Sequence, residues 1–161
     1  MKSAVRSSGF GNAIEVRCSR GVKGISARWV RRVLRVALDD QKAQRRAVSV
    51  FLTNNREIRK INRDFLKHDY PTDVISFWCP EKSLGPGESG YLGDLAVSVQ
   101  MAREVSRKLG LPFKEELARY LVHGVLHLLG YEDKGKRDRM EMDRKQEAIL
   151  KKVARWRKGH S

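Results

Sequence analysis

The chain contains little cysteine and no long apolar run. Its only two cysteines, Cys18 and Cys79, do not form a CxxC pair, which argues against a disulfide framework and favours a reducing, cytoplasmic compartment. No window approaches the roughly 18 apolar residues that a membrane-spanning helix needs. The first residues, MKSAVRSSGFGNAIEV, also lack the apolar core of a signal peptide. We therefore expect a soluble protein with no membrane association.

Acidic residues are scarce relative to basic ones. The chain has 19 Asp and Glu residues against 34 Lys and Arg residues, which gives a formal net charge of +15. Such an excess favours a polyanionic partner, with nucleic acid first and an anionic membrane surface second. A length of 161 residues and a hydrophobic fraction of 40% predict one domain over 1–161. The ends, 1–12 and 155–161, are expected to be loose.

Alternation and helical spacing predict a mixed order of elements. Strands are expected at 13–19, 48–53, 73–78 and 92–99. Helices are expected from Ser26 to about 41, from Asn54 or Asn55 to about 64, at 102–109, from about 112 to 129, and at 136–154. The stretch 81–90, EKSLGPGESG, is the most typical of a loop. This order predicts the α+β class.

The richest motif is HGVLHLLGYED, from His123 to Asp133. Residues at i and i+4 share one helix face, so His123 and His127 lie side by side. Gly130 is expected to end the helix, which lets Asp133 swing back toward both imidazoles. This pattern predicts a site of two histidines and one carboxylate, with one coordination position left for water.

Other interpretations of this motif stay open. An HxxxH spacing alone is more often a pair of hydrogen-bonded core histidines than a metal site. The glutamate of the HExxH zinc proteases is absent, so that mechanism is not supported. Gly124, inside the helix, costs roughly 1 kcal/mol against alanine, which suggests that another backbone or a substrate comes close. His68 and His160 are expected to be surface histidines.

Three blocks together resemble the YbeY-type rRNA maturation endoribonucleases. The family's HGxLHLxGYDH corresponds to HGVLHLLGYED, its TDVLSF to TDVISF at 72–77, and its LGDI to LGDL at 92–95. A family asparagine and aromatic upstream correspond to Asn62 and Phe65. The blocks keep the family's order and spacing, and the resemblance spans about 45–150.

The resemblance implies a small mixed β-sheet packed with helices, with the histidine helix near the centre. It implies one zinc-like ion per chain, held by His123, His127 and Asp133, with other transition metals as alternatives. It also implies a single-strand endoribonuclease for the 3′ end of small-subunit ribosomal RNA and for ribosome quality control. The implied partners are ribosomal RNA and the small ribosomal subunit, and we expect a monomer.

Two positions depart from the family. The third family ligand is a histidine, whereas this chain has Asp133, a harder and charged ligand that can weaken the preference for zinc. An arginine implicated in activity is replaced by Leu66. The adjacent Lys67 can substitute as a point charge but cannot form the planar fork of a guanidinium. We therefore expect Lys67 and Glu132, an available carboxylate for proton transfer, as the catalytic candidates.

Further residues are expected around the cleft and on a basic surface. Thr72, Asp73, Ser76 and the pair Gly93–Asp94 are expected to shape the cleft floor, largely as architecture. One helix face carries four arginines opposite an apolar face and is expected to bind RNA phosphates. These arginines are Arg28, Arg31, Arg32 and Arg35. Trp156, in the basic tail, is expected to stack on a base.

Two other functions remain open from the sequence. One is an RNA-binding or ribosome assembly factor with a structural metal and little catalysis, which Leu66 and Asp133 favour. The other is a metal-dependent hydrolase of a non-nucleic substrate, which the strong positive charge opposes.

Overall fold

The structure is a computed structural model that describes residues 11–80 and 90–159, except for the side chains of Arg157 and Lys158. The predicted loose start, most of the 81–90 loop and His160 therefore lie outside the described residues. Among the described helices, none combines the length and the apolar character required to cross a bilayer.

The elements follow the predicted order of strands and helices. The strands are β1 (Ala13–Cys18), β2 (Ala47–Thr53), β3 (Val74–Trp78) and β4 (Tyr91–Ser98). The helices are α1 (Ala27–Asp40), α2 (Asn55–Leu66), α3 (Val99–Leu109), α4 (Phe113–Leu128) and α5 (Lys136–Gly159). The predicted α+β class is confirmed.

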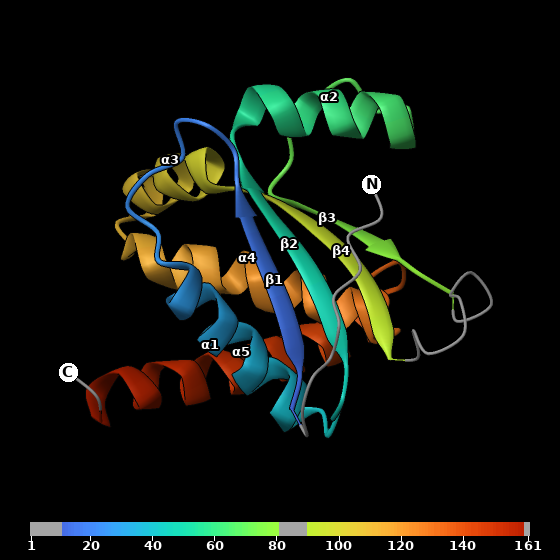
Figure 1. Ribbon diagram of the computed structural model, residues 1–161, viewed down its shortest axis with the longest axis vertical. Coiled ribbons are helices and arrows are strands. Elements are labelled where there is room, and N and C mark those ends of the chain that lie inside the picture. Colours follow the sequence, from blue (N-terminus) through green and yellow to red (C-terminus); the bar gives the residue numbers. More distant parts are fainter. Residues whose placement is uncertain (1–10, 81–89, 160–161) are drawn as a thin grey trace.

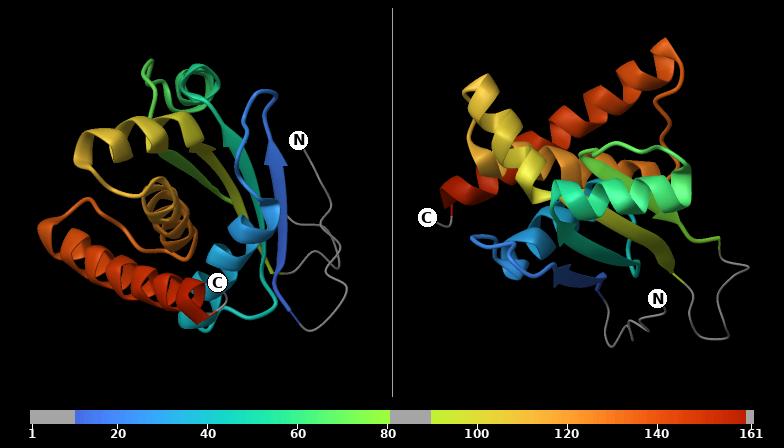
Figure 2. Two further views of the ribbon diagram at one scale, coloured as in Figure 1. Left: turned by 90° about the vertical axis from the view of Figure 1, so that its left-hand side faces the viewer. Right: turned by 90° about the horizontal axis from the view of Figure 1, so that it is seen from above.

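One mixed sheet forms the centre of the fold, with the strand order β1-β2-β4-β3. β1, β2 and β4 run parallel, and β3 pairs antiparallel with β4 at one edge. In Figure 2, α4 lies between the sheet and α5, with α1 and α3 flanking it. The expected position of the histidine helix near the centre is therefore confirmed (Figure 1).

Side-chain alternation separates two cores on the two faces of the sheet. Leu95 and Val97 of β4 pack into the main core with α1, α4 and α5, whereas Ala96 points to a smaller core beneath α2. In β3, Ile75 belongs to the smaller core, while Val74 packs against the main one. This period of two is the expected behaviour of strands covered on both faces. It also directs Ser76 toward α4.

Helix caps explain where the helices begin. Ser26 Oγ accepts a hydrogen bond from the Trp29 amide, and Asn54 Oδ1 accepts one from the Glu57 amide, as the sequence predicts. α3 starts at Val99 rather than at the predicted residue 102. The reason is that Ser98 Oγ accepts from the Met101 amide and begins the helix directly at the end of β4.

The last helix is longer than predicted. α5 continues to Gly159, so residues 155–159 are helical rather than loose. Two contacts between α5 and α1 accompany this extension: the Arg32 guanidinium lies 4.7 Å from the centre of the Trp156 ring, and Lys152 forms an ion pair with Asp40. On its inner face, α5 buries Met142, Ile149 and Leu150.

Candidate metal centre

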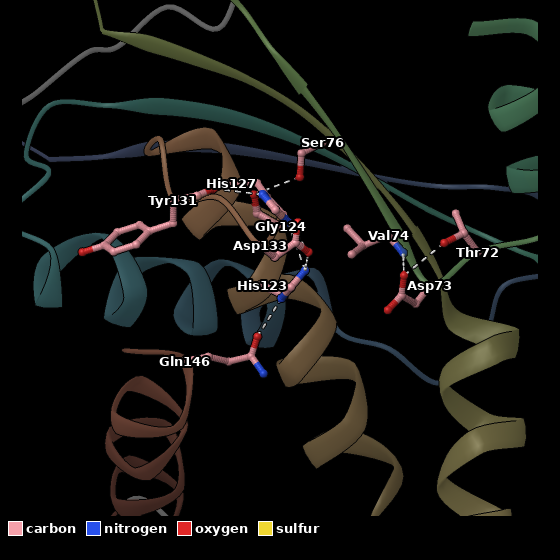
Figure 3. A network of polar contacts seen from close by, with 10 residues as sticks. All are labelled: Thr72, Asp73, Val74, Ser76, His123, Gly124, His127, Tyr131, Asp133 and Gln146. Atoms are coloured by element: carbon pink, nitrogen blue, oxygen red, sulfur yellow. Dashed lines mark hydrogen bonds and ion pairs between the residues drawn. The ribbon is translucent and has the colours of Figure 1, made fainter. Parts of the chain in front are cut away.

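α4 places the two histidines of the motif in contact. His123 and His127 stand one turn apart on the same face, and their Nε2 atoms are 3.1 Å from each other (Figure 3). Both side chains are about a quarter exposed, at 27% and 28%, so they are buried by the helix packing yet reachable from solvent. The spacing of one helical turn thus produces the convergence that the sequence predicts.

The chain reversal after α4 brings a carboxylate to the same point. The Gly130 amide donates to the His127 carbonyl at 3.0 Å, and Gly130 itself has a φ of +99°, a conformation that favours glycine. Asp133 Oδ2 then lies 3.8 Å from His123 Nε2 and 3.5 Å from His127 Nε2. One ligand atom from each of the three residues lies within 4.8 Å of the others.

The far nitrogen of each imidazole has its own acceptor. His123 Nδ1 donates to Gln146 Oε1 of α5 at 2.9 Å, and His127 Nδ1 donates to the Tyr131 carbonyl at 3.0 Å. A neutral imidazole that carries its proton on Nδ1 has a lone pair on Nε2. Such outer contacts typically fix the tautomer and orientation of metal-binding histidines. When both imidazoles are neutral, each therefore directs its Nε2 lone pair toward the common point.

These residues fit a divalent cation. Two Nε2 lone pairs at 3.1 Å and a nearby carboxylate oxygen repel one another unless positive charge lies between them. Imidazole nitrogen and carboxylate oxygen are ligands that zinc accepts, at about 2.0–2.2 Å from the ion. The cluster could therefore bind a metal through His123, His127 and Asp133.

Gln146 belongs to this site although no motif in the sequence indicates it. In α5 it stands in the buried stripe formed by Met142, Ile149 and Val153, and it is only 7% exposed. A polar residue inside an apolar stripe needs a hydrogen-bond partner, which is the signal that the sequence contained. Its partner could not be read from local spacing, because His123 is 23 residues away.

The cluster opens into a cleft of about 720 Å³. Glu132 lines this cleft, and so does Leu66, at the position of the family arginine. Lys67 does not line it: this residue ends α2 in a left-handed conformation with a φ of +62°. Lys134, which the sequence analysis did not consider, lines the cleft instead.

The cleft floor includes Thr72, Asp73 and Ser76, as expected. Asp73 Oδ1 accepts hydrogen bonds from the Val74 amide at 2.7 Å and from the Thr72 hydroxyl at 3.1 Å, which is an architectural role. On α4, burial together with the charges of Glu116 and Asp73 raises the pKa of Tyr120. This phenol therefore stays neutral.

The Gly93–Asp94 pair lies away from the cleft, contrary to expectation. A Cβ at Gly93, whose φ is +145°, would lie 2.0 Å from the Phe77 carbonyl oxygen, so only glycine fits beside β3. Asp94 is exposed and accepts a hydrogen bond from the Tyr91 hydroxyl. Burial and this hydrogen bond raise the pKa of Tyr91. Gly93 therefore allows β4 to lie close to β3, and Asp94 forms a contact within β4 itself.

Gly124 is a point of close packing rather than of backbone or substrate approach. A Cβ there would lie 2.9 Å from Leu95 Cδ2 and 3.0 Å from Val74 Cγ2, both side chains of the sheet. Its carbonyl accepts a hydrogen bond from the Ser76 hydroxyl at 2.9 Å. Gly124 thus lets the sheet and the histidine helix come together.

The four arginines of α1 do not line the cleft. Arg28 and Arg35 are exposed, whereas Arg31 Nε donates to the Ile14 carbonyl at 3.1 Å. Arg32 covers the ring of Trp156, so this indole already has a partner within the protein. The opposite face packs into the core as predicted, through Val30, Val33, Leu34, Ala37 and Leu38.

Comparison with known proteins gives one consistent family. The family model described as Endoribonuclease YbeY matches residues 17–154. An Endoribonuclease YbeY of Persephonella marina is 36% identical over 75% of this chain and 78% of its own length, and one of Bacillus licheniformis is 42% identical over 71% and 76%. A solution structure of a Thermotoga maritima protein superposes with a TM-score of 0.63 at 25% identity, covering 91% of this chain and 93% of that one.

Proposed function

The chain belongs to the endoribonuclease YbeY family, whose members are RNA-cleaving hydrolases, and we propose that its substrate is single-stranded ribosomal RNA precursor. The proposed reaction matures the 3′ end of the small-subunit RNA and takes part in ribosome quality control. The proposed enzyme is a cytoplasmic monomer that works as one domain over 1–161 on the small ribosomal subunit.

The convergence of two imidazole lone pairs supports a metal-dependent reaction. His123, His127 and Asp133 would hold the ion, and we propose zinc as the native metal. When bound, such an ion supplies Lewis acidity toward the phosphodiester and lowers the pKa of water from 15.7 to about 7. Gln146 and the Tyr131 carbonyl keep the two rings in the tautomer that this binding requires.

The surrounding residues would serve proton transfer and charge. Glu132 lines the cleft next to Asp133, which supports our proposal that its carboxylate accepts a proton from the attacking group. Lys134 lines the same cleft and would neutralise a phosphate. Lys67, expected as a catalytic point charge in place of the family arginine, lies at the end of α2 outside the cleft and stays a proposed catalytic candidate.

The basic surface on α1 would bind a part of the RNA that lies at a distance from the reacting phosphate. Arg28 and Arg35 are exposed on α1, while Arg31 and Arg32 also have contacts within the protein. For single strands, each lost phosphate contact lowers the salt slope of binding by about 0.7. We expect the double change Arg28→Ala and Arg35→Ala to reduce this slope, and an unchanged slope would remove this face from the binding surface.

The test of the function combines metal content with RNA cleavage. Metal is measured by mass spectrometry on the purified protein, and cleavage is measured on precursor rRNA for the wild type, His123→Ala and Leu66→Arg. We expect metal and activity in the wild type, and loss of both in His123→Ala. Gln100→Ala is the control, because Gln100 is exposed on α3 and does not line the cleft. Cleavage that resists chelators would refute the metal-dependent reaction, and products ending in a cyclic phosphate would indicate attack by the RNA 2′-hydroxyl.

Family membership favours the enzyme over a binding factor with a structural metal. Leu66→Arg separates the two directly, because it restores the family guanidinium at a residue that lines the cleft. A wild type that binds rRNA without cleaving it, together with an active Leu66→Arg variant, would identify the natural protein as mainly an RNA binder.

A further inference from the structure

The cleft exposes large aromatic side chains at its rim. Tyr70 is 54% exposed and Trp78 is 65% exposed, and both line the cleft that contains the histidine pair. A single exposed apolar residue needs no explanation, but two large rings on one cavity mark a binding surface. Tyrosine and tryptophan offer a broad flat face to a ligand with little conformational freedom to lose.

Tyr70 is held in place before any ligand arrives. Its carbonyl accepts a hydrogen bond from Asn62 Nδ2 at 2.9 Å, and Asn62 is only 2% exposed. Its ring stacks on His68, with centroids 5.4 Å apart and an interplanar angle of 11°, and its hydroxyl contacts His68 Nδ1 at 3.2 Å. A ring fixed in this way loses little entropy when a second planar group stacks on it.

Trp78 is directed to the same side by the geometry of β3. Residues at i and i+2 share one face of a strand, so Trp78 lies on the face of Ser76. The Ser76 hydroxyl donates to the Gly124 carbonyl, and Gly124 lies between the two histidines in α4. The middle of β3 therefore faces the histidine pair. Tyr70 precedes this strand and Trp78 ends it, and both residues line the same cleft as the histidine pair.

Charge identifies the kind of ligand that these rings would take. The whole chain carries a net charge of +15, and Lys134 lines the cleft. In the part of the chain that the structure describes, no ion pair or hydrogen bond engages the Lys134 ammonium group. Flat aromatic faces beside a cation suit a ligand with planar groups on an anionic backbone, which describes an unpaired nucleic-acid strand.

We propose that Tyr70 and Trp78 are stacking contacts for unpaired bases on either side of the scissile phosphate, with Lys134 on a neighbouring phosphate. The inference rests on the proposed function, because it assigns the substrate contacts of the same cleft. The proposal predicts a preference for single strands, since the bases of a duplex are stacked inside the helix and cannot reach the rings.

The test measures binding and cleavage separately on the full-length chain. Fluorescence anisotropy follows a labelled single-stranded RNA of mixed sequence, the same strand in a duplex, and an abasic ribose-phosphate chain of equal length. Strand integrity is checked on a denaturing gel. The variants are Tyr70→Ala, Trp78→Ala and Trp78→Phe. Leu109→Ala and Met140→Ala are the matched controls, because these side chains are 62% and 63% exposed outside the cleft.

We expect each alanine variant to bind the single strand about five- to a hundredfold more weakly, the range found for the loss of one base–aromatic stack. Trp78→Phe should recover most of this loss, and binding of the abasic chain should stay at the wild-type level. Equal losses with both chains, or no loss with either, would overturn the proposal. Binding of the variants to the small ribosomal subunit is measured separately by co-sedimentation. A loss in this assay alone would assign the two rings to a protein contact and would also overturn the proposal.

Cleavage distinguishes the failure of this inference from the failure of the proposed function. If the wild type cleaves precursor rRNA and the alanine variants bind and cleave it equally well, the proposed function is supported and the stacking contacts are refuted. The wild type could instead bind RNA without cleaving it in the presence of any divalent metal, while the alanine variants lose base-dependent binding. This result would refute the proposed function and support the stacking contacts.

Discussion

Replacing Gln146 with leucine tests whether α5 sets the tautomer of His123. Gln146 Oε1 accepts the proton of His123 Nδ1 at 2.9 Å, and leucine removes this acceptor at similar volume. The proton can then move to Nε2 and be donated to His127 Nε2, which is 3.1 Å away. A metal ion must displace that proton before it can bind both nitrogens.

The size of the effect follows from this competition. Loss of an outer hydrogen-bond partner typically lowers metal affinity 10- to 100-fold, which corresponds to about 1.4–2.8 kcal/mol. Gln146→Glu should bind zinc as tightly as the wild type or more tightly, because a carboxylate is the stronger acceptor for the Nδ1 proton. If the hydrogen bond to His123 determines affinity, only the leucine variant therefore binds zinc more weakly than the wild type.

Affinity is measured by competition with a chromophoric zinc chelator, and circular dichroism checks that each variant is folded. Gln100→Leu is the matched control, since Gln100 is exposed on α3 and does not line the cleft. Unchanged affinity in a folded Gln146→Leu would refute the reasoning. Equal weakening by leucine and glutamate would also refute it, because packing of α5 would then explain the loss.

Three further changes test other parts of the structure. Gly124→Ala should lower the free energy of unfolding by up to about 2 kcal/mol. The new Cβ lies 2.9 Å from Leu95 Cδ2, and such overpacking costs about 1–3 kcal/mol, of which the better helix propensity of alanine offsets about 1 kcal/mol. A higher urea midpoint would contradict this packing. Asp133→His should raise the preference for zinc over manganese in competition titrations, since imidazole is the softer ligand, and an unchanged ratio would show that the third ligand does not set selectivity. Asp40→Asn tests pH dependence: burial raises the pKa of Asp40, but hydrogen bonds, chiefly from Lys152, outweigh it and hold the pKa below its ordinary 3.8. The charged carboxylate therefore stabilises the fold above pH 3.8, and this stabilisation is lost as the pH falls through the lowered pKa. Asp40→Asn should lower the free energy of unfolding by roughly 0.5–1 kcal/mol at neutral pH and should have no effect in strong acid. A difference in thermal stability that stays constant with pH would contradict this prediction.

Local patterns in the sequence were enough to predict the elements and the three candidate ligands. Alternation and capping residues such as Ser26 located the strands and helices, and the i, i+4 spacing with a glycine turn brought His123, His127 and Asp133 together. These features depend on contacts between near neighbours in the chain, which is why they can be read from it.

Contacts between distant segments were not predictable in the same way. The pairing of Gln146 with His123, and of Trp156 with Arg32, depends on how α5 packs on α4 and α1. The position of Lys134 in the cleft depends on the path of the turn after Gly130. The opposite placement of the arginines and the apolar residues on α1 was predicted from the sequence. The separation of these arginines from the cleft was not, because it depends on how the whole domain packs.

The order of segments along the chain has a consequence for biosynthesis. All three candidate ligands precede α5, yet the acceptor that orients His123 lies within that helix. Translation proceeds from the N-terminus, so a growing polypeptide contains the ligands before it contains Gln146. A nascent nuclease would thus hold its ion weakly until α5 has docked, and full activity would begin only after that step.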